Sequence, residues 1–182
     1  EIARLERANA SLVELETGNP DWDAALAFSQ SVSLAAYVGP TRYLSHPSFV
    51  LVRSPDHGYS ARGDGRDYDL YWDGQTAGHA YVNLLQLLPA APQLAKGALL
   101  NFLEAQDPEG AIDWKPGLGG QRNGALCTPL LAGLSWRIYQ WTEDAAFLAQ
   151  VLPGLLRFFD SWFSPENDRD QDGHPDWQDT LQ

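Results

Sequence analysis

The sequence predicts an all-α protein built from helical hairpins. Apolar residues recur at helical spacing over most of the chain, Pro and Gly separate these stretches, and short connections alternate with long ones. With 182 residues, of which 44% are apolar, the chain is long enough for one domain with a substantial core. A short β-hairpin is expected in one place only, the insert at residues 41–71. Helical spacing is absent there, and residues 49–52 read Phe-Val-Leu-Val.

The first two helices are expected over residues 2–16 and 22–38. The first has spaced Ile, Leu and Val side chains among Glu and Arg, and Gly18 ends it. An Asn-Pro-Asp run at 19–21 stops that helix and caps the second, which a Gly-Pro pair then breaks. Because the second helix is rich in Ala, Leu and Ser and poor in charge, we expect most of its surface to be buried.

Four further helices are expected in the rest of the chain, over residues 74–88, 92–106, 129–141 and 145–163. Proline marks the start of the second of these, and the last is expected to restart at Pro153, because proline inside a helix removes a backbone hydrogen bond. Four aromatic residues at helical spacing are predicted to lie in the core: Phe102, Trp136, Phe147 and Phe158.

The charge balance excludes several classes of partner. Twelve Lys and Arg residues oppose 24 Asp and Glu residues, which gives a net charge of −12. Such a chain repels phosphate backbones and anionic membrane surfaces, so neither nucleic acid nor membrane is an expected partner. We expect a soluble protein, with the cytoplasm as the favoured location, whose ligands are neutral or cationic, such as sugars and metal ions. The single cysteine, Cys127, is interpreted as a small buried residue rather than a nucleophile.

The most specific local pattern is an acidic run near the C-terminal end. Residues 168–176 read Asp-Arg-Asp-Gln-Asp-Gly-His-Pro-Asp, with carboxylates at positions 1, 3 and 5 and Gly at position 6, as in a calcium loop of the EF-hand type. Calcium prefers about six to eight hard oxygens, and alternate side chains of a tight turn converge on one point. The alternative is a solvated acidic turn between helices. The predicted structural calcium ligands are Asp168, Asp170, Asp172, His174 (through its carbonyl), Asp176 and Asp179.

A second pattern, Asp-Leu-Tyr-Trp-Asp-Gly-Gln at 69–75, places Asp73 where a long loop turns into a helix. Its position favours a helix N-cap. The alternative is a carboxylic acid at a pocket mouth, whose pKa is raised by Tyr71 and Trp72 so that it can protonate a leaving group. The two interpretations conflict, because a helix N-terminus lowers the pKa of a carboxyl group. The residues alone leave both open.

Aromatic residues in or beside the long loops offer flat apolar faces next to Asp, Asn and Arg, which suit pyranose rings. Lids on the core are the alternative explanation. The residues concerned are Tyr59, Tyr68, Trp72 and Trp114.

Several short runs, in this order and spacing, together resemble a known family. They are Tyr-Trp-Asp-Gly-Gln at 71–75, Leu-Leu-Pro at 87–89, Leu-Ala-Lys at 94–96, Asn-Phe-Leu at 101–103, Gly-Ala-Ile at 110–112, Thr-Pro-Leu-Leu-Ala at 128–132, Trp-Arg-Ile-Tyr at 136–139 and the acidic turn at 168–177. The stretch 68–178 resembles glycoside hydrolase family 63 and its relatives among the glycogen-debranching (amylo-glucosidase) type enzymes, which form (α/α)6 toroids.

This resemblance implies an inverting α-glucosidase-type hydrolase that acts on oligosaccharides. It places the general acid on Asp73, the walls of the −1 subsite on Tyr71 and Trp72, and a polar pocket rim on Arg122 and Asn123. It also implies the calcium-type turn, with Asp176 where the family usually has Glu.

Inversion requires a second carboxylate about 6.5–9.5 Å from the acid, to activate water. In the family this base lies in the last helical hairpins, and a toroid has about twice the helices expected here. We therefore interpret residues 1–182 as a single-domain fragment, the N-terminal half of a catalytic toroid. It is expected to be inactive alone, and its partner is the remaining C-terminal half.

Two other functions stay open. One is a non-catalytic, calcium-stabilised helical interaction module, in which Asp73 is only a cap. The other is a toroid-shaped sugar-processing enzyme with a different reaction, such as a lyase, an epimerase or a phosphorylase. A Glu that faces Asp73 from a downstream hairpin would favour hydrolysis.

Overall fold

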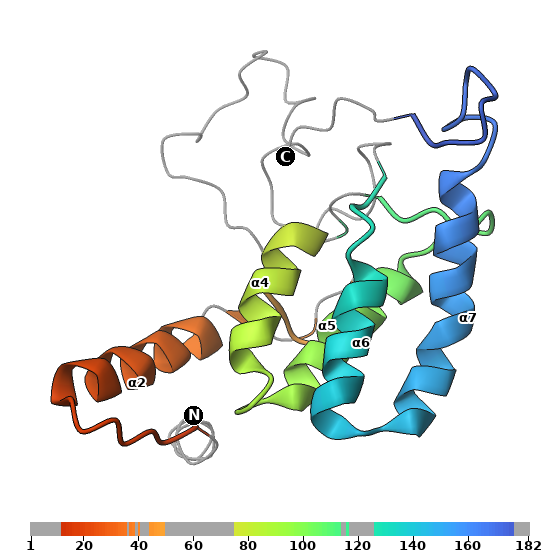
Figure 1. Ribbon diagram of the computed structural model, residues 1–182. Helices are drawn as coiled ribbons and strands as arrows, with labels where there is room; N and C mark the ends of the chain where they lie inside the picture. Colours follow the sequence, from red (N-terminus) through yellow and green to blue (C-terminus); the bar gives the residue numbers. More distant parts are fainter. Residues whose placement is uncertain are drawn as a thin grey trace, which may run out of the picture.

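The computed structural model describes residues 12–35, 37–38, 40, 44–49, 75–113, 116 and 126–176. Within these residues the chain is mostly helical, as predicted (Figure 1). The five helices found there are α2 (Pro20–Ala35), α4 (Ala77–Leu87), α5 (Pro92–Glu104), α6 (Leu131–Thr142) and α7 (Ala145–Trp162).

Strand structure in the same residues is limited to one short antiparallel pair, β1 (Tyr37–Val38) with β2 (Ser48–Phe49). Tyr37 pairs with Phe49, and Val38 pairs with Ser48. The expected hairpin was placed within 41–71, whereas the observed pair joins a strand before that range to one near its start. An isolated bridge between Asp113 and Leu126 is the other strand-like contact described.

Helices α4 to α7 form two antiparallel hairpins, α4/α5 and α6/α7, that pack against each other (Figure 1). Helix α5 contacts both α6 and α7, and α4 contacts α6. All four helices begin and end within three residues of the predicted bounds. A closed toroid is not seen in the part of the chain that the structure describes.

The core lies between these hairpins, and its apolar side chains come from all four helices. Phe102, Phe147 and Phe158 are buried, as predicted. Trp136 is not: it is 52% exposed and stacks on Tyr139 with the ring centroids 5.5 Å apart. Its helical spacing was real, but the helix face that carries it points outward. The largest fully buried side chains in these helices include Leu84, Leu99, Phe102, Leu134 and Ile138.

Helix α2 stands apart from the two hairpins and packs mainly on α4 (Figure 1). Its only buried residue is Gln30, while Trp22 and Phe28 are 68% and 71% exposed. The expectation that most of this helix is buried is therefore wrong. The prediction of a helix over residues 2–16 is also wrong for residues 12–16, the part of that range that the structure describes, because they are not helical. The amide of Gln30 holds them instead: it accepts from Val13 N at 2.9 Å and donates to Val13 O at 3.0 Å.

Helix α7 runs through Pro153 without the expected restart. Proline deprives the carbonyl of Ala149 of its helical hydrogen bond. Both residues lie on an exposed face, where water can bind that carbonyl, so the break in the hydrogen-bond ladder does not end the helix.

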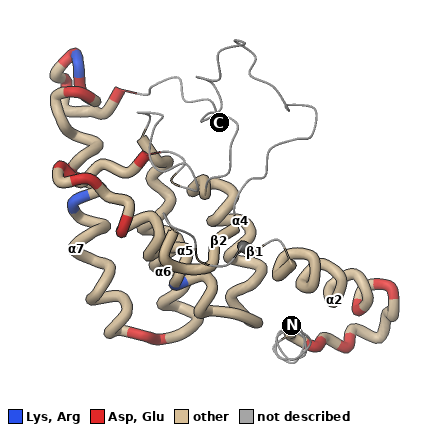
Figure 2. The backbone as a smooth tube through the Cα atoms, turned by 180° about the vertical axis from the view of Figure 1, so that it is seen from behind, with Lys and Arg blue, Asp and Glu red and all other residues tan. Residues whose placement is uncertain are grey.

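Acidic residues gather at both ends of α7 (Figure 2). None of the helices described combines the length with the apolar character needed to cross a membrane.

Candidate functional site

The described residues that flank the predicted site segments lie at one end of the two hairpins (Figure 1). Helix α4 starts there and α7 finishes there, leading into the acidic run. We call this the loop end and define it as residues 75–76, 105–113, 116, 126–130 and 163–176. The opposite end, with the short connections 88–91 and 143–144, is the turn end.

A fully buried amide, Gln75, joins three segments at the loop end. Its backbone N donates to Pro116 O at 2.7 Å, and its Nε2 donates to Ala98 O of α5 at 2.7 Å. Asn101, also buried in α5, lies 3.5 Å from Gln75 Oε1 through its Nδ2. Asn101 also exchanges two hydrogen bonds with the backbone of His46, at 2.9 and 3.1 Å. Gln75, two positions after Asp73 in the sequence, is thus fixed to the core.

The residue at the N-cap of α4 is Thr76, and its Oγ1 lies 2.7 Å from His79 Nδ1. The alternative in which Asp73 is the N-cap is therefore wrong, since Asp73 precedes the N-cap by three positions in sequence. Asp73 itself lies outside the described residues, as do the predicted substrate-binding residues Tyr59, Tyr71, Trp72, Trp114, Arg122 and Asn123.

The two flanks of residues 114–125 are also held together. Asp113 and Leu126 form a bridge, and Cys127 N donates to Ile112 O at 2.7 Å. Cys127 is fully buried, as predicted. Burial raises the pKa of its thiol far above the usual range, and the negative charge of Asp113 adds to this. Its thiolate is therefore scarce at neutral pH, which agrees with a structural rather than a nucleophilic role.

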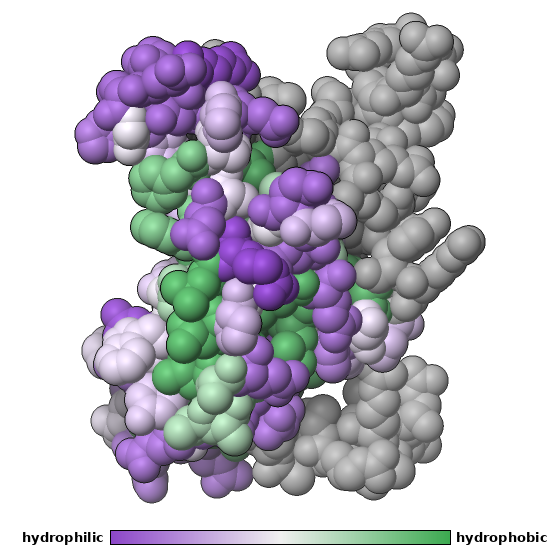
Figure 3. Space-filling model, turned by 90° about the vertical axis from the view of Figure 1, so that its right-hand side faces the viewer, coloured by the Kyte–Doolittle hydropathy of each residue, from purple (hydrophilic) through white to green (hydrophobic). Residues whose placement is uncertain are grey.

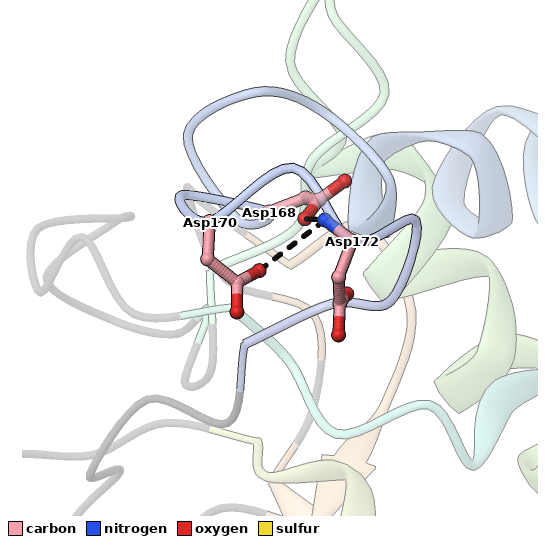
Figure 4. A group of neighbouring side chains, drawn as sticks. All are labelled: Asp168, Asp170 and Asp172. Carbon is pink, nitrogen blue, oxygen red and sulfur yellow. Dashed lines mark hydrogen bonds between the residues drawn. The ribbon is translucent and has the colours of Figure 1, made fainter.

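Three of the predicted calcium ligands come together (Figure 4). Carboxylate oxygens of Asp168, Asp170 and Asp172 lie within 4.8 Å of one another. The backbone N of Asp172 donates to Oδ1 of Asp168 at 3.1 Å and to Oδ1 of Asp170 at 3.3 Å. Gly173, at the sixth position, has a φ of +84°, so the glycine stands where the turn needs a left-handed residue.

The other three predicted ligands, His174, Asp176 and Asp179, are not part of this group of three carboxylates. Oδ2 of Asp176 accepts from Arg169 N at 2.9 Å, so this carboxylate closes the loop beside the triad. His174 donates its backbone N to Asp172 Oδ1 at 2.8 Å. Asp179 lies outside the described residues.

The acidic loop is attached to α7 through Asn167, which is buried. Its Nδ2 donates to Ser161 O at 3.0 Å and to Ser164 Oγ at 3.1 Å. Sequence reasoning missed this residue, and it missed Gln75 and Asn101 as well. For Asn101 a signal existed, because it is the one polar residue in the run Leu99-Leu100-Asn101-Phe102-Leu103.

Three carboxylates supply the hard oxygens that calcium prefers, and backbone carbonyls or water would have to complete the about six to eight ligands. Asp168 is half-buried, whereas Asp170 and Asp172 are exposed. This donor set fits calcium, and it equally fits a solvated acidic turn whose carboxylates bind its own backbone.

No protein-family model matches the chain, and no curated protein matches its sequence. The likeness to family 63 therefore depends on the short runs quoted above alone.

Proposed function

We propose that this chain forms part of an inverting glycoside hydrolase of the α-glucosidase type, acting on oligosaccharides. Asp73 is the general acid that protonates the oxygen of the leaving group, and Tyr71 and Trp72 line the subsite beside it. A second carboxylate, supplied from outside residues 1–182, activates water on the other face of the sugar.

The observation that supports this proposal best is the 2.7 Å hydrogen bond from Gln75 N to Pro116 O. It joins the chain just after Tyr71-Trp72-Asp73 to the chain just after Trp114. Sugar hydrolysis needs a carboxylic acid beside flat apolar faces, and it needs both on a rigid support. The buried amides of Gln75 and Asn101 provide such a support at the base of both segments.

The position of the N-cap bears on the pKa of Asp73, for which the two interpretations of this residue require opposite shifts. A general acid must remain protonated near neutral pH, whereas a helix N-terminus favours the carboxylate. Because Thr76 is the N-cap, Asp73 lies three positions before it in the sequence and outside the first turn of α4, to which the effect of the helix dipole is largely confined. Burial against aromatic rings and a nearby base carboxylate then raise the pKa with less opposition.

The remaining residues take supporting roles in this proposal. Tyr59, Trp114, Arg122 and Asn123 contact the sugar around the pocket. The acidic loop binds one structural calcium ion, which fixes the exit from α7 and takes no part in the chemistry. The other hairpins of a toroid, outside these residues, complete the site.

The test is Asp73→Asn in the natural polypeptide that includes the second carboxylate. Asn keeps the shape but cannot deliver a proton, so turnover of an oligosaccharide should fall on the order of 10²–10⁴-fold while the fold survives. Aryl glycosides with good leaving groups should lose less, because their leaving group needs no protonation. Asp69→Asn is the matched control. Full activity of Asp73→Asn would exclude Asp73 as the acid.

A second candidate is the calcium-stabilised interaction module. The convergence of Asp168, Asp170 and Asp172 favours it, because that cluster is the one group of potential metal ligands within the described residues. In that case calcium would still stabilise the protein, but no oligosaccharide would be hydrolysed by any longer form of the chain.

A further inference from the structure

Two hollows in the described part of the surface border α7, and they differ in chemistry. One, of about 210 Å³, lies in the apolar band that Figure 3 shows below the acidic loop. Because its lining is almost entirely apolar, it offers little that would select one ligand over another. The other, of about 420 Å³, lies towards the turn end, between α5, the start of α7 and the segment that carries His46.

The second hollow, which we call the turn-end pocket, combines polar and apolar surface. Its volume falls within the range of about 300–1,000 Å³ that small-molecule pockets usually have, and such pockets place a few polar groups beside an apolar wall. The polar lining side chains are His46, Gln93, Lys96, Asp144 and Gln150, and Ala146 is part of the apolar wall.

The wall that carries His46 is fixed by two features of α5. Asn101, which is fully buried, exchanges two hydrogen bonds with the backbone of His46, at 2.9 and 3.1 Å. Gly97 leaves room for this approach, because an added Cβ would lie 2.9 Å from Cβ of His46. Nε2 of His46 also lies 3.2 Å from Oε1 of Glu104. This wall is therefore held in place before any ligand binds, which lowers the entropic cost of binding.

The charged part of the pocket is an ion pair that joins the two helices. The Lys96 side chain is only 12% exposed, and its Nζ lies 2.6 Å from Oδ2 of Asp144. An ammonium group has three N–H donors and a carboxylate accepts about four hydrogen bonds, so both groups keep capacity for a ligand. Because each charge has the other as its partner, the pair as a whole is neutral.

Two side-chain amides add further hydrogen-bonding capacity, one from each helix. Gln93 of α5 and Gln150 of α7 are exposed, and neither amide bonds to another residue in the part of the chain that the structure describes. Each amide offers two donors and one acceptor oxygen. Together with the ion pair, they present donors and acceptors in comparable numbers.

This balance matches a neutral ligand that carries several hydroxyl groups. A hydroxyl both donates and accepts, so adjacent hydroxyls of a sugar can donate to Asp144 and accept from Lys96. An anion would compete with Asp144 for Lys96, in a chain whose net charge of −12 already repels it. A cation would compete with Lys96 for Asp144. A neutral sugar has neither disadvantage, and its apolar ring face suits the apolar wall.

We infer that the turn-end pocket is a binding site for a neutral sugar in its pyranose form. This inference goes beyond the proposed function and does not depend on it, because no residue of the pocket takes part in the proposed hydrolysis. An inactive protein would therefore leave it standing.

The experiment is an NMR titration of the isotope-labelled protein with D-glucose and, separately, with maltose. The backbone amide signals of Gly97, Ala146 and Gln150 should shift and saturate with a Kd on the order of 1 mM, as for a small ligand held by neutral hydrogen bonds. Inorganic phosphate and acetate should leave these signals in place. If neither sugar shifts them at about 100 times that concentration, the inference is overturned. Saturation by phosphate instead of sugar would also overturn it.

A double variant tests whether the pocket residues hold the sugar. Gln93→Ala with Gln150→Ala removes both amides and leaves the ion pair intact, and both side chains are exposed, so the fold should survive. Sugar binding should weaken on the order of 10-fold or more, from the loss of two hydrogen-bonding groups. Gln86→Ala, an exposed glutamine of α4 outside the pocket, is the matched control and should keep the wild-type Kd. A double variant that binds as tightly as this control would overturn the assignment.

A second variant tests the space itself. Ala146 is exposed near the start of α7, so Ala146→Trp should fill the pocket with little change in melting temperature. The sugar-induced shifts of Gly97 and Gln150 should then disappear. Shifts of the same size and concentration dependence as in the wild type would show that the sugar lies elsewhere.

Discussion

The two ends of the helical hairpins differ in where their polar groups find partners. At the turn end, two residues connect α6 to α7, and the carboxylate of one of them, Asp144, has two partners. Its Oδ1 accepts from Phe147 N at 2.9 Å as the N-cap of α7, and its Oδ2 pairs with Lys96 Nζ of α5 at 2.6 Å. Lys96 also lies 5.1 Å from the centroid of the Phe147 ring. One cation and one anion thus join α5 to the start of α7.

At the loop end the connections are long, and many charged groups bond within their own loop. Asp168 and Asp170 both accept from the backbone of Asp172, and Asp176 accepts from Arg169. Attachment to the core depends on the buried amides of Gln75, Asn101 and Asn167. The comparison indicates two different roles. The turn end stabilises the hairpins through contacts between helices, while the loop end carries an acidic loop that is attached to the core by buried amides, and such loops are where functional residues are usually found.

The largest effect is expected at one rigid point of the loop end, Gly110. Its φ is +97°, and an added Cβ would collide with the backbone carbonyl oxygen of Arg157 in α7. Gly110→Ala should lower the free energy of unfolding by about 3 kcal/mol, through backbone strain and overpacking combined.

Gly173→Ala is the matched control for Gly110. Its φ of +84° is similar, but nothing lies within 4 Å of the added Cβ, so only the strain of about 1–2 kcal/mol remains. Urea denaturation of both variants measures the difference. Equal losses would show that α7 and the segment after α5 are not in close contact.

Calcium should stabilise the folded protein by binding at the loop end. At a calcium concentration about 100 times the dissociation constant, mass action adds about 2.7 kcal/mol to the free energy of unfolding. The double variant Asp170→Asn with Asp172→Asn should remove this gain, whereas Asp144→Asn at the turn end should keep it. Thermal unfolding with calcium and with a chelator measures the response. A response that survives the double variant would exclude this loop as the site.

The smallest effect is a pH dependence at the turn end. The hydrogen bond from Lys96, followed by that from the Phe147 amide, lowers the pKa of Asp144 below its ordinary value. A lowered pKa in the folded state gives stability that is present above the unfolded pKa of about 3.9 and is lost as the pH falls through the folded value.

Asp144→Asn keeps a capping oxygen but loses the charge. Its melting temperature should therefore be slightly below that of the wild type at pH 7 and should converge with it in strong acid. Asp160→Asn, on the exposed face of α7, is the control. A difference in melting temperature between Asp144→Asn and the wild type that widens as the pH falls would contradict a lowered pKa of Asp144.

Much of the helical structure follows from local spacing. The bounds of α4 to α7 were predicted closely because the apolar periodicity and the prolines at 89 and 92 are properties of neighbouring residues. The Asp-x-Asp-x-Asp-Gly run likewise predicted the convergence of three carboxylates, and the glycine at its sixth position is the residue that the structure shows with a positive φ. Neither result required knowledge of distant contacts.

Burial could not be predicted in the same way. Trp136 and Phe28 are large apolar side chains within helices, as core residues often are, yet both are exposed. Burial depends on whether another element covers that face of the helix. Pro153 was expected to make the helix restart, but α7 is continuous there, with Val151 and Leu155 buried in the core on either side of the proline.

The sequence by itself determined the helical class, the bounds of the four central helices and the acidic turn, since these depend on interactions between residues close in the chain. Only the tertiary structure decided that Gln75 meets Pro116, that Asn101 holds His46, and that α2 stands apart with its aromatic residues exposed. The two pairings join residues that are 41 and 55 positions apart in the sequence, and the shape and polarity of the packed core select them. The exposure of α2 likewise depends on which elements cover it.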